Sequence, residues 1–148
     1  MVRWGMTNPR TRAERKKDTL RRLAQDVDAW VATADDSGPY LMPLSFHWDG
    51  TALLFSTFAT NPTARNLVAT GRARVALGET RDVVMIEGTA TVVEPTDEVA
   101  AAFAKRAGFD PRVLKKYPYF QVRPRQIQAW REVDEIKDRT IMRDGEWI

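Results

Sequence analysis

Residues 39–66 read PYLMPLSFHWDGTALLFSTFATNPTARN. The runs at 40–48 and 52–58 are joined by Asp49-Gly50, a strong signal for a tight hairpin, so we expect two antiparallel strands here. Asn61-Pro62 then opens a short helix, because asparagine caps free N–H groups and proline is well tolerated at the first helical position. This hairpin, followed at once by a helix start, decides the fold, and the other elements extend it.

The same stretch gathers groups that bind anions. Ser56 and Thr57 end the second strand as hydroxyl donors, while Arg65 and Asn66 add a forked cation and an amide just inside the helix, whose free N–H groups favour negative charge. The sequence therefore predicts a phosphate site beside a β-surface. Each residue also has an ordinary interpretation, with Arg65 as a solvated helix residue and the two hydroxyls as partners of nearby backbone groups.

Pro43 and Gly88 are unusual strand residues. A proline cannot donate to a sheet ladder, so Pro43 predicts a sheet edge, a bulge, or a ligand lying against that backbone. A plain sheet edge, with no ligand beside it, explains Pro43 as well as a bound ligand does. Gly88 lies inside the long strand expected at 83–94 and predicts a bulge or a close backbone approach.

The remaining pattern is mainly β with inserted helices. We expect helices from Asn8-Pro9 to about Gln25, from 61 to 70, from 96 to 107 and a shorter one from 111. Further strands are expected at 29–34, 74–77, 119–123, 127–133 and 140–142. Hairpin links without regular βα alternation predict an α+β, mainly antiparallel barrel or sandwich. The GxGxxG and GxxxxGK[ST] phosphate motifs are absent from the sequence.

Size and composition predict one ordinary globular domain over residues 1–148, with a basic helical arm at 1–26 and the barrel at 27–148. Of its 148 residues 43% are hydrophobic and 29% are charged, and none is cysteine. A thiolate nucleophile, a thiolate metal site and a disulfide framework are thereby excluded. The N-terminal stretch lacks an apolar signal core, and no apolar run is long enough to cross a bilayer, so we expect a cytoplasmic protein without a membrane partner.

The charge is unevenly distributed. Between Arg3 and Arg22 eight basic residues face two acidic ones, a balance of +6, whereas the rest of the chain carries 15 basic and 18 acidic residues. A mildly acidic body argues against a nucleic-acid-binding surface, and the arm offers no aromatic platform for bases. The arm either attracts an anionic tail of a ligand or forms a solvated helix face.

Residues with catalytic potential are few. His47, the single histidine, lies between Phe46 and Trp48 and far from any cluster with metal-ligand spacing, so a hydrogen-bonded strand residue is the favoured interpretation. The Asp35-Asp36 pair is expected in a turn. No catalytic residue and no metal site are identified, so a cofactor must supply any chemistry.

Several motifs in order carry a resemblance to a known family. They are Pro43 to Gly50, Leu54 to Thr57, Ala64 to Leu67, Ile86 to Gly88, Tyr119-Phe120 and Ala129-Trp130. Together they resemble the pyridoxamine 5'-phosphate oxidase-like, FMN-binding split β-barrel superfamily, and within it the short actinobacterial flavin/deazaflavin oxidoreductases. The resemblance covers most of the chain after residue 28 and implies an antiparallel split β-barrel with peripheral helices.

The resemblance also implies a homodimer with two cofactor sites at the subunit interface, each holding FMN or coenzyme F420, a 5-deazaflavin. In such proteins the strand at Met42, Pro43 and Leu44 offers its backbone to the flavin-like ring. The implied phosphate ligands are Ser56, Thr57, Arg65 and Asn66, and the residues that close the site are Asp82 from the second subunit, Trp130 and Arg139. Trp130 equally suits a core or dimer-interface role.

The chain departs from the authentic oxidase at two places. Asn66 stands where a second basic residue is usual, and the ending Arg143 to Ile148 lacks that enzyme's substrate-binding pattern, which argues against oxidation of vitamin B6. The expected activity is hydride transfer between the bound cofactor and an unsaturated or quinone-like small molecule. The alternative is a non-enzymatic protein that binds or carries a flavin or a tetrapyrrole.

Overall fold

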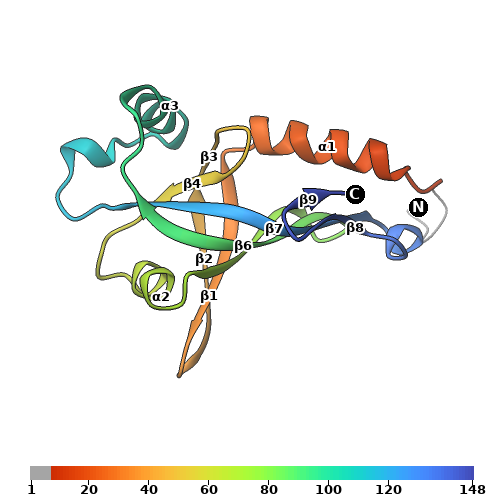
Figure 1. Ribbon diagram of the computed structural model, residues 1–148, viewed down its shortest axis with the longest axis horizontal. Coiled ribbons are helices and arrows are strands. Elements are labelled where there is room, and N and C mark those ends of the chain that lie inside the picture. The colour runs from red at the N-terminus through yellow and green to blue at the C-terminus, as the bar shows by residue number, and fades with distance from the viewer. Residues whose placement is uncertain (1–7) are drawn as a thin grey trace.

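The computed structural model describes residues 8–148; the first seven residues, with Arg3 of the basic arm, lie outside the described part. Strands dominate this part, with three α-helices and two 3-10 helices around them (Figure 1). The helices are α1 (Arg12–Gln25), α2 (Pro62–Thr70), α3 (Asp97–Ala107), η1 (Pro111–Val113) and η2 (Val133–Glu135). The strands are β1 (Asp28–Asp35), β2 (Gly38–Ser45), β3 (His47–Trp48), β4 (Leu53–Ser56), β5 (Arg72–Glu79), β6 (Asp82–Val93), β7 (Tyr119–Arg131), β8 (Thr140–Arg143) and β9 (Glu146–Trp147).

All nine strands join one antiparallel sheet, which curls into a half-barrel. The order is β2-β1-β5-β6-β7-β4-β3, and β8 pairs with β7 and carries β9. The expected mainly β, antiparallel α+β fold is therefore confirmed. In Figure 1, α1 and α2 lie on opposite sides of this sheet, and α3 lies beside β3 and β4.

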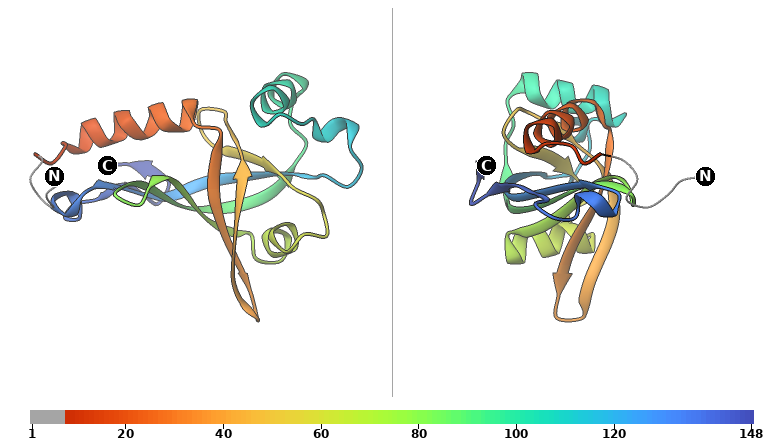
Figure 2. Two further views of the ribbon diagram at one scale, coloured as in Figure 1. Left: turned by 180° about the vertical axis from the view of Figure 1, so that it is seen from behind. Right: turned by 90° about the vertical axis from the view of Figure 1, so that its right-hand side faces the viewer.

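The β1–β2 hairpin projects beyond α2, as both views of Figure 2 show. β2 is the last strand of the sheet, and Pro43 pairs with Trp30 of β1 on one side only. A strand without a second neighbour tolerates a residue that lacks an N–H group. The prediction that Pro43 faces a sheet edge is confirmed.

The strand expected at 40–48 is divided at Phe46. Phe46 is fully buried, and its N–H donates to the carbonyl oxygen of Val27. β2 therefore stays with β1, whereas β3 turns away and pairs with β4 through the predicted Asp49-Gly50 turn. Because the Phe46 ring is buried between them, the two halves of the run at 40–48 become β2 and β3, at opposite ends of the sheet.

A bulge at Gly88 bends the long β6–β7 ladder. The register shifts between Glu87 and Gly88, so that Gly88 faces Pro124 while Glu87 faces Gln126. A Cβ atom on residue 88 would lie 2.6 Å from Val122 Cγ1, closer than real contacts allow. Both predicted roles of Gly88 are confirmed. The bulge also lets β7 run without a break through Pro124, whereas two separate strands were expected there.

The N-terminal helix begins later than predicted. Thr11, and not Asn8, is the residue that caps α1: its Oγ1 accepts from the N–H of Glu14, and the Glu14 carboxylate accepts from the N–H of Thr11. This reciprocal capping box satisfies two otherwise free donors, so it outweighs the Asn8-Pro9 signal.

Buried charges hold α1 to the barrel. Glu135 of η2 is fully buried and accepts from Arg10 Nη2 at 2.7 Å, from the Arg10 backbone N–H and from the N–H of Arg131. Burial alone would raise the pKa of Glu135, but the hydrogen bonds from Arg10 outweigh it and lower that pKa to about 2. Arg15 adds hydrogen bonds to the carbonyl oxygens of Glu135 and Asp138. The start of α1 is thus a charged anchor to the barrel, a role that neither of the two interpretations of the basic arm included.

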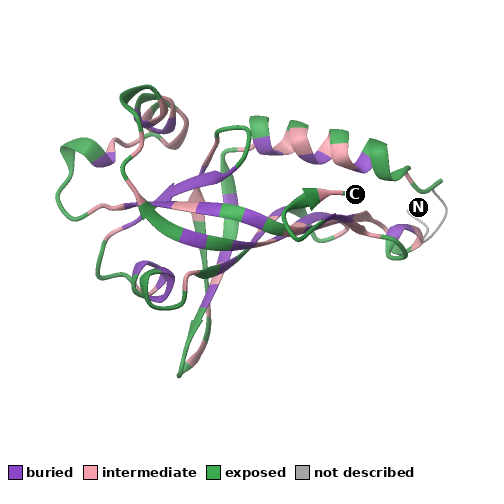
Figure 3. Cartoon of the chain, in the orientation of Figure 1, coloured by how far each residue is buried: buried purple, intermediate pink, exposed green. Residues whose placement is uncertain are grey.

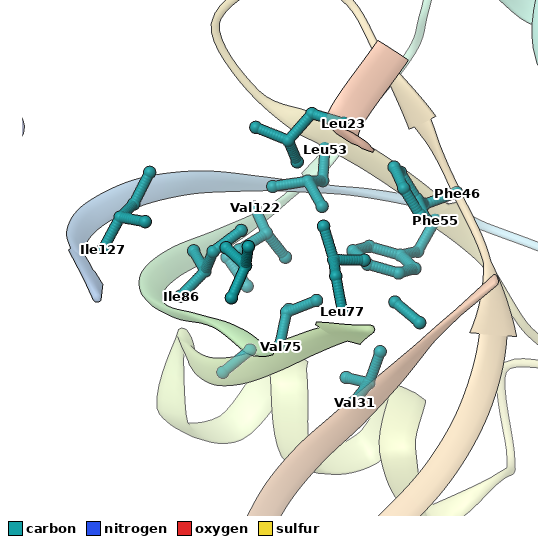
Figure 4. Packing of buried hydrophobic residues seen from close by; sticks show 14 of the residues in the cluster. Leu23, Val31, Phe46, Leu53, Phe55, Val75, Leu77, Ile86, Val122 and Ile127 are labelled. Carbon is teal, nitrogen blue, oxygen red and sulfur yellow. The ribbon is translucent and has the colours of Figure 1, made fainter. Parts of the chain in front are cut away.

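Buried residues alternate with exposed ones along the strands and lie on the side of α1 that faces the sheet (Figure 3). Figure 4 shows that the side chains of the core come from α1, the two ends of the sheet and its centre. Phe46 and Phe55 lie with ring centroids 6.1 Å apart at one end. Full burial of such a side chain contributes about 1.5–3 kcal/mol. A second cluster, around Phe103 of α3, packs against Leu54 and Tyr119.

Candidate cofactor site

A polar cavity of about 380 Å³ lies between the start of α2 and the turn of the β1–β2 hairpin. Its polar side chains include Arg65, Asn66, Ser37 and Asp35. The Arg65 side chain is exposed, and no hydrogen bond or ion pair engages it among residues 8–148. Hydrogen bonds from Ser37 lower the pKa of Asp35, and the Arg65 guanidinium adds to this shift. Arg65 is thus a cation available to a ligand, with one exposed carboxylate nearby.

Asn66 has a structural partner. It is 5% exposed, and its Nδ2 donates to Thr33 Oγ1 on β1 at 3.1 Å. This bond fixes the rotation of α2 against the sheet, and it therefore determines the direction in which the neighbouring Arg65 points. Because Asn66 is buried and its amide already holds α2 to β1, its role beside a ligand is mainly to position the helix.

The two hydroxyls at the end of β4 differ in what they offer. Ser56 Oγ donates to the carbonyl oxygen of Pro118 at 2.9 Å, which commits its only proton. Thr57 Oγ1 accepts from Asn61 Nδ2 at 3.0 Å and keeps its own proton for another acceptor. Of the predicted pair, Thr57 is the better donor to an anion.

The first turn of α2 leaves polar groups unused. No side chain caps this nine-residue helix, because the Asn61 amide turns to Thr57 instead. Thr63 Oγ1 is buried and has no hydrogen-bond partner within residues 8–148. The uncapped N–H groups of this first turn and the free guanidinium of Arg65 are groups that bind phosphate.

Met42, Pro43 and Leu44 lie along β2 at the free edge of the sheet. Met42 is 36% exposed, while Leu44 packs partly against the core. Because β2 pairs only with β1, its outer backbone groups are open along this edge in the described part of the chain. A planar ring can lie against such a strand and use these groups.

The other predicted residues lie at the far end of the sheet. Trp130 and Arg139 form a pair, with the guanidinium carbon 5.5 Å from the ring centroid. Asp82, at the start of β6, faces Arg22 of α1 at 3.4 Å and Arg10 at 3.8 Å. The Asp82 carboxylate therefore already has cationic neighbours within its own chain.

Two half-sites result. α2 lies beside the far end of β6, since Gly71 at its C-terminus accepts a hydrogen bond from the N–H of Ala90. Ala90 lies eight positions after Asp82 along β6, which corresponds to about 26 Å of strand. One chain therefore does not bring Arg65 together with Trp130 and Arg139.

His47 and the acidic groups offer no metal centre. Burial lowers the pKa of His47, and the nearby Arg106 guanidinium adds to the shift. Both effects favour the neutral imidazole. Among residues 8–148 no group of three or more His, Asp or Glu side chains is placed to hold a metal ion.

Sequence reasoning missed the residues that complete the α2 half-site. These are Asp35 and Ser37, which line the cavity, and Thr33, which holds Asn66. Thr33 has an inward position in the alternation of β1, which signals burial but not its partner.

Sequence comparison identifies the class of protein. Residues 17–131 match the model of the pyridoxamine 5'-phosphate oxidase family. The chain belongs to this family, a part of the FMN-binding split-barrel superfamily. Comparison with curated proteins gave no significant match.

Solved structures share the fold at low sequence identity. The heme storage protein HutZ from Vibrio cholerae has a TM-score of 0.63 at 17% identity, over 82% of this chain and 99% of that one. An F420 reductase gives 0.60 at 20% identity, over 72% and 93%. A FAD-binding protein from Mesorhizobium loti gives 0.63 at 15% identity, over 81% and 92%. Within the described residues, no helix combines the length and apolarity needed to span a bilayer.

Proposed function

We propose that this protein binds FMN or coenzyme F420 and transfers hydride between the cofactor and an unsaturated or quinone-like small molecule. The observation that carries the proposal is the unpaired Arg65 beside the uncapped start of α2, in a chain of this family. Arg65, the first-turn N–H groups of α2 and the hydroxyl of Thr57 would hold the phosphate. The β2 edge at Met42, Pro43 and Leu44 would support the ring.

The residues of the chain position and shield the reactants. When bound, the cofactor supplies a ring carbon or nitrogen that accepts or gives up hydride. The phosphate anchor would fix the ring in one orientation, and the second copy proposed below would keep water from the reacting face. Among the described residues we assign no proton donor, so a protic substrate or solvent would supply the proton.

The arm bears on the choice between the two cofactors. A polyanionic coenzyme tail would be drawn to free basic side chains, but Arg10, Arg15 and Arg22 are engaged with the barrel. Lys16 lies 5.0 Å from the ring centroid of Trp147. Only part of the arm's +6 balance is thus available to a ligand, and the proposal keeps FMN and F420 as equal candidates.

The proposal includes a homodimer. An apolar surface of Trp30, Ala32, Leu41, Ala76 and Met85 crosses β2, β1, β5 and β6, with Trp30 49% and Leu41 58% exposed. Large exposed apolar side chains gathered on one sheet face indicate a protein contact. A second copy on this face would also supply the Trp130 and Arg139 half-site that one chain cannot bring to Arg65.

A substitution that introduces a charged side chain into this apolar surface tests whether the protein is a dimer. Trp30→Glu should convert the dimer into a monomer in analytical ultracentrifugation at micromolar concentration, because a carboxylate would be buried without a partner at the contact. Val113→Glu, at an apolar residue of η1 that is 79% exposed, is the matched control and should leave the dimer intact. A wild-type protein that sediments as a monomer would refute this part of the proposal.

A flavin or tetrapyrrole carrier is the alternative. It is favoured by the fold shared with a heme storage protein and by the absence of an assigned proton donor among the described residues. Such a protein needs a binding surface but no access for a second substrate.

One experiment separates the two functions. The purified protein is titrated with FMN, F420 and heme, and each complex is then reduced and mixed with a panel of quinones and activated alkenes. The proposal expects saturable binding of FMN or F420 and reoxidation of the bound cofactor by at least one acceptor, faster than with free cofactor. Heme binding without FMN or F420 binding, or a bound cofactor that no acceptor reoxidises faster than free cofactor, supports the carrier.

A further inference from the structure

A cleft lies where the sheet divides into two branches. β7 pairs with β4 through its first residues and with β8 farther along, and in the described part of the chain no strand pairs with residues 123–126 on that side. One branch ends in β3 and the other in β9 (Figure 1). A cavity of about 330 Å³ opens at this gap, and its lining comes from β7 and from both branches.

Two tryptophans line the cleft, one from each branch. Trp48 of β3 and Trp147 of β9 are both partly buried and pack against the core. The ammonium group of Lys16 on α1 lies over the Trp147 ring, 5.0 Å from its centroid, and helps to hold that ring in place. Ordered aromatic rings in a cavity of this size suit the flat apolar part of a small molecule.

The charged side chains of the lining are Arg123, Arg125, Asp144 and Glu146. All four are exposed, and none of their side chains makes a hydrogen bond or an ion pair with a residue between 8 and 148. Two guanidinium groups and two carboxylates thus meet at one cleft without neutralising one another. The cleft offers donors for a carboxylate and acceptors for an ammonium group at the same time.

The backbone fixes where these charges lie. The Arg125 carbonyl oxygen accepts from the N–H of Gly145 at 2.8 Å, so β7 is tied to the turn between β8 and β9. The Arg125 guanidinium lies against this turn, because a Cβ atom on residue 145 would be 3.0 Å from Arg125 Nη1. Arg125 therefore lies beside the turn that carries both carboxylates but pairs with neither.

The two Asp-Gly turns at the cleft use their carboxylates differently. Asp49 Oδ1 accepts from the N–H groups of Thr51 and Ala52, both at 2.8 Å, so this carboxylate is engaged within its own turn. Asp144 accepts no such bond from a described residue. The carboxylate of the second turn is thus left for a ligand.

We propose that this cleft binds a small zwitterion with a flat aromatic group, as in an aromatic α-amino acid. The two tryptophans contact the ring, the two arginines bind the carboxylate, and the two acidic side chains bind the ammonium group. The lining shares no residue with the α2 half-site and includes neither Trp130 nor Arg139. The site therefore depends on neither FMN nor F420.

Calorimetric titration of the full chain with L-phenylalanine, L-tyrosine and L-tryptophan tests this site. Wild-type protein should bind at least one of them with one site per chain. Three further probes each lack one feature of phenylalanine: 3-phenylpropionate lacks the ammonium group, phenethylamine lacks the carboxylate, and L-alanine lacks the ring. Each should bind about tenfold or more weakly than the tightest amino acid, because a charge-assisted or aromatic contact is lost.

Two variants assign the charges of the cleft. Arg125→Gln should weaken binding of the amino acid about tenfold and leave binding of phenethylamine unchanged, because that probe has no carboxylate. Asp144→Asn should weaken binding of the amino acid and leave binding of 3-phenylpropionate unchanged. Asparagine tolerates the positive φ of residue 144, so the turn is kept. A variant that had merely lost its fold would not discriminate between the probes.

Two controls separate the cleft from general charge attraction and from the cofactor site. Lys115→Gln removes an exposed charge outside the cleft and should bind the amino acid like the wild type. Arg65→Ala should also bind it unchanged, so failure of the cofactor proposal would not disturb this measurement. The proposal would be overturned by a wild type that binds none of the three amino acids saturably, by single-charge probes that bind as tightly as the amino acid, or by equal losses in Lys115→Gln and Arg125→Gln.

Discussion

Glu135→Gln should lower the free energy of unfolding by about 3 kcal/mol, since removing one member of a buried ion pair leaves the other charge uncompensated. Glu135 is 1% exposed, and its carboxylate accepts hydrogen bonds from the backbone and guanidinium of Arg10 and from the N–H of Arg131 on β7. Asp18, 2.9 Å from Arg10, would keep part of the compensation, so we expect the lower end of the usual range. Urea unfolding followed by tryptophan fluorescence measures the change.

The control for this variant is Glu146→Gln, at an exposed carboxylate on β9, which should change stability by less than about 0.5 kcal/mol. Equal stabilities for Glu135→Gln and the wild type would mean that the ion cluster does not hold α1 to the barrel.

Low pH should remove the stability that the Glu135 carboxylate contributes. The pKa of Glu135 is lowered from 4.5 to about 2 in the folded protein, so the native state binds its proton less readily than the unfolded chain. The stability from this carboxylate is full above about pH 4.5 and is lost as the pH falls towards 2. The gap between wild type and Glu135→Gln should therefore close over this range, and a gap that stays constant would contradict the assignment.

Arg65→Ala should weaken binding of FMN or F420 by about 10- to 100-fold, the range expected for the loss of one charge-assisted contact to phosphate. The Arg65 side chain is exposed and unpaired, so its removal costs the fold little and the loss reports on the ligand. Cofactor fluorescence or absorbance titration measures the affinity.

The matched control for Arg65 is Arg21→Ala, which removes a 56% exposed guanidinium from α1 on the other side of the sheet. It should bind the cofactor within about twofold of the wild type, because screening weakens its effect at that distance. If Arg65→Ala binds the cofactor as tightly as Arg21→Ala does, Arg65 is not the phosphate anchor.

Elements specified by local chemistry could be predicted. The Asp49-Gly50 turn, the helix start at Pro62 with its end at Gly71, and the bulge at Gly88 all depend on neighbouring residues in the sequence. The start of α1 also had a local signal, the Thr11–Glu14 capping box, which competed with Asn8-Pro9.

Long-range partners could not be predicted in this way. Ser56 donates to a carbonyl group 62 residues later, and Asp82 meets Arg22 of α1 from 60 residues away. Both side chains were assigned to a ligand because their partners within the chain are invisible in the local sequence. Their assignment to the cofactor site stays a prediction, and the same holds for Asn66, Trp130 and Arg139.

The central claim is that a phosphorylated ring cofactor binds at Arg65 and is closed in by a second copy of the chain. A crystal structure of the protein with FMN or F420 tests this most directly. We predict that the phosphate lies within hydrogen-bonding distance of Arg65 and the first turn of α2, with Trp130 and Arg139 of the second copy beside the ring. A cofactor bound away from Arg65, or enclosed by a single chain, would contradict the account.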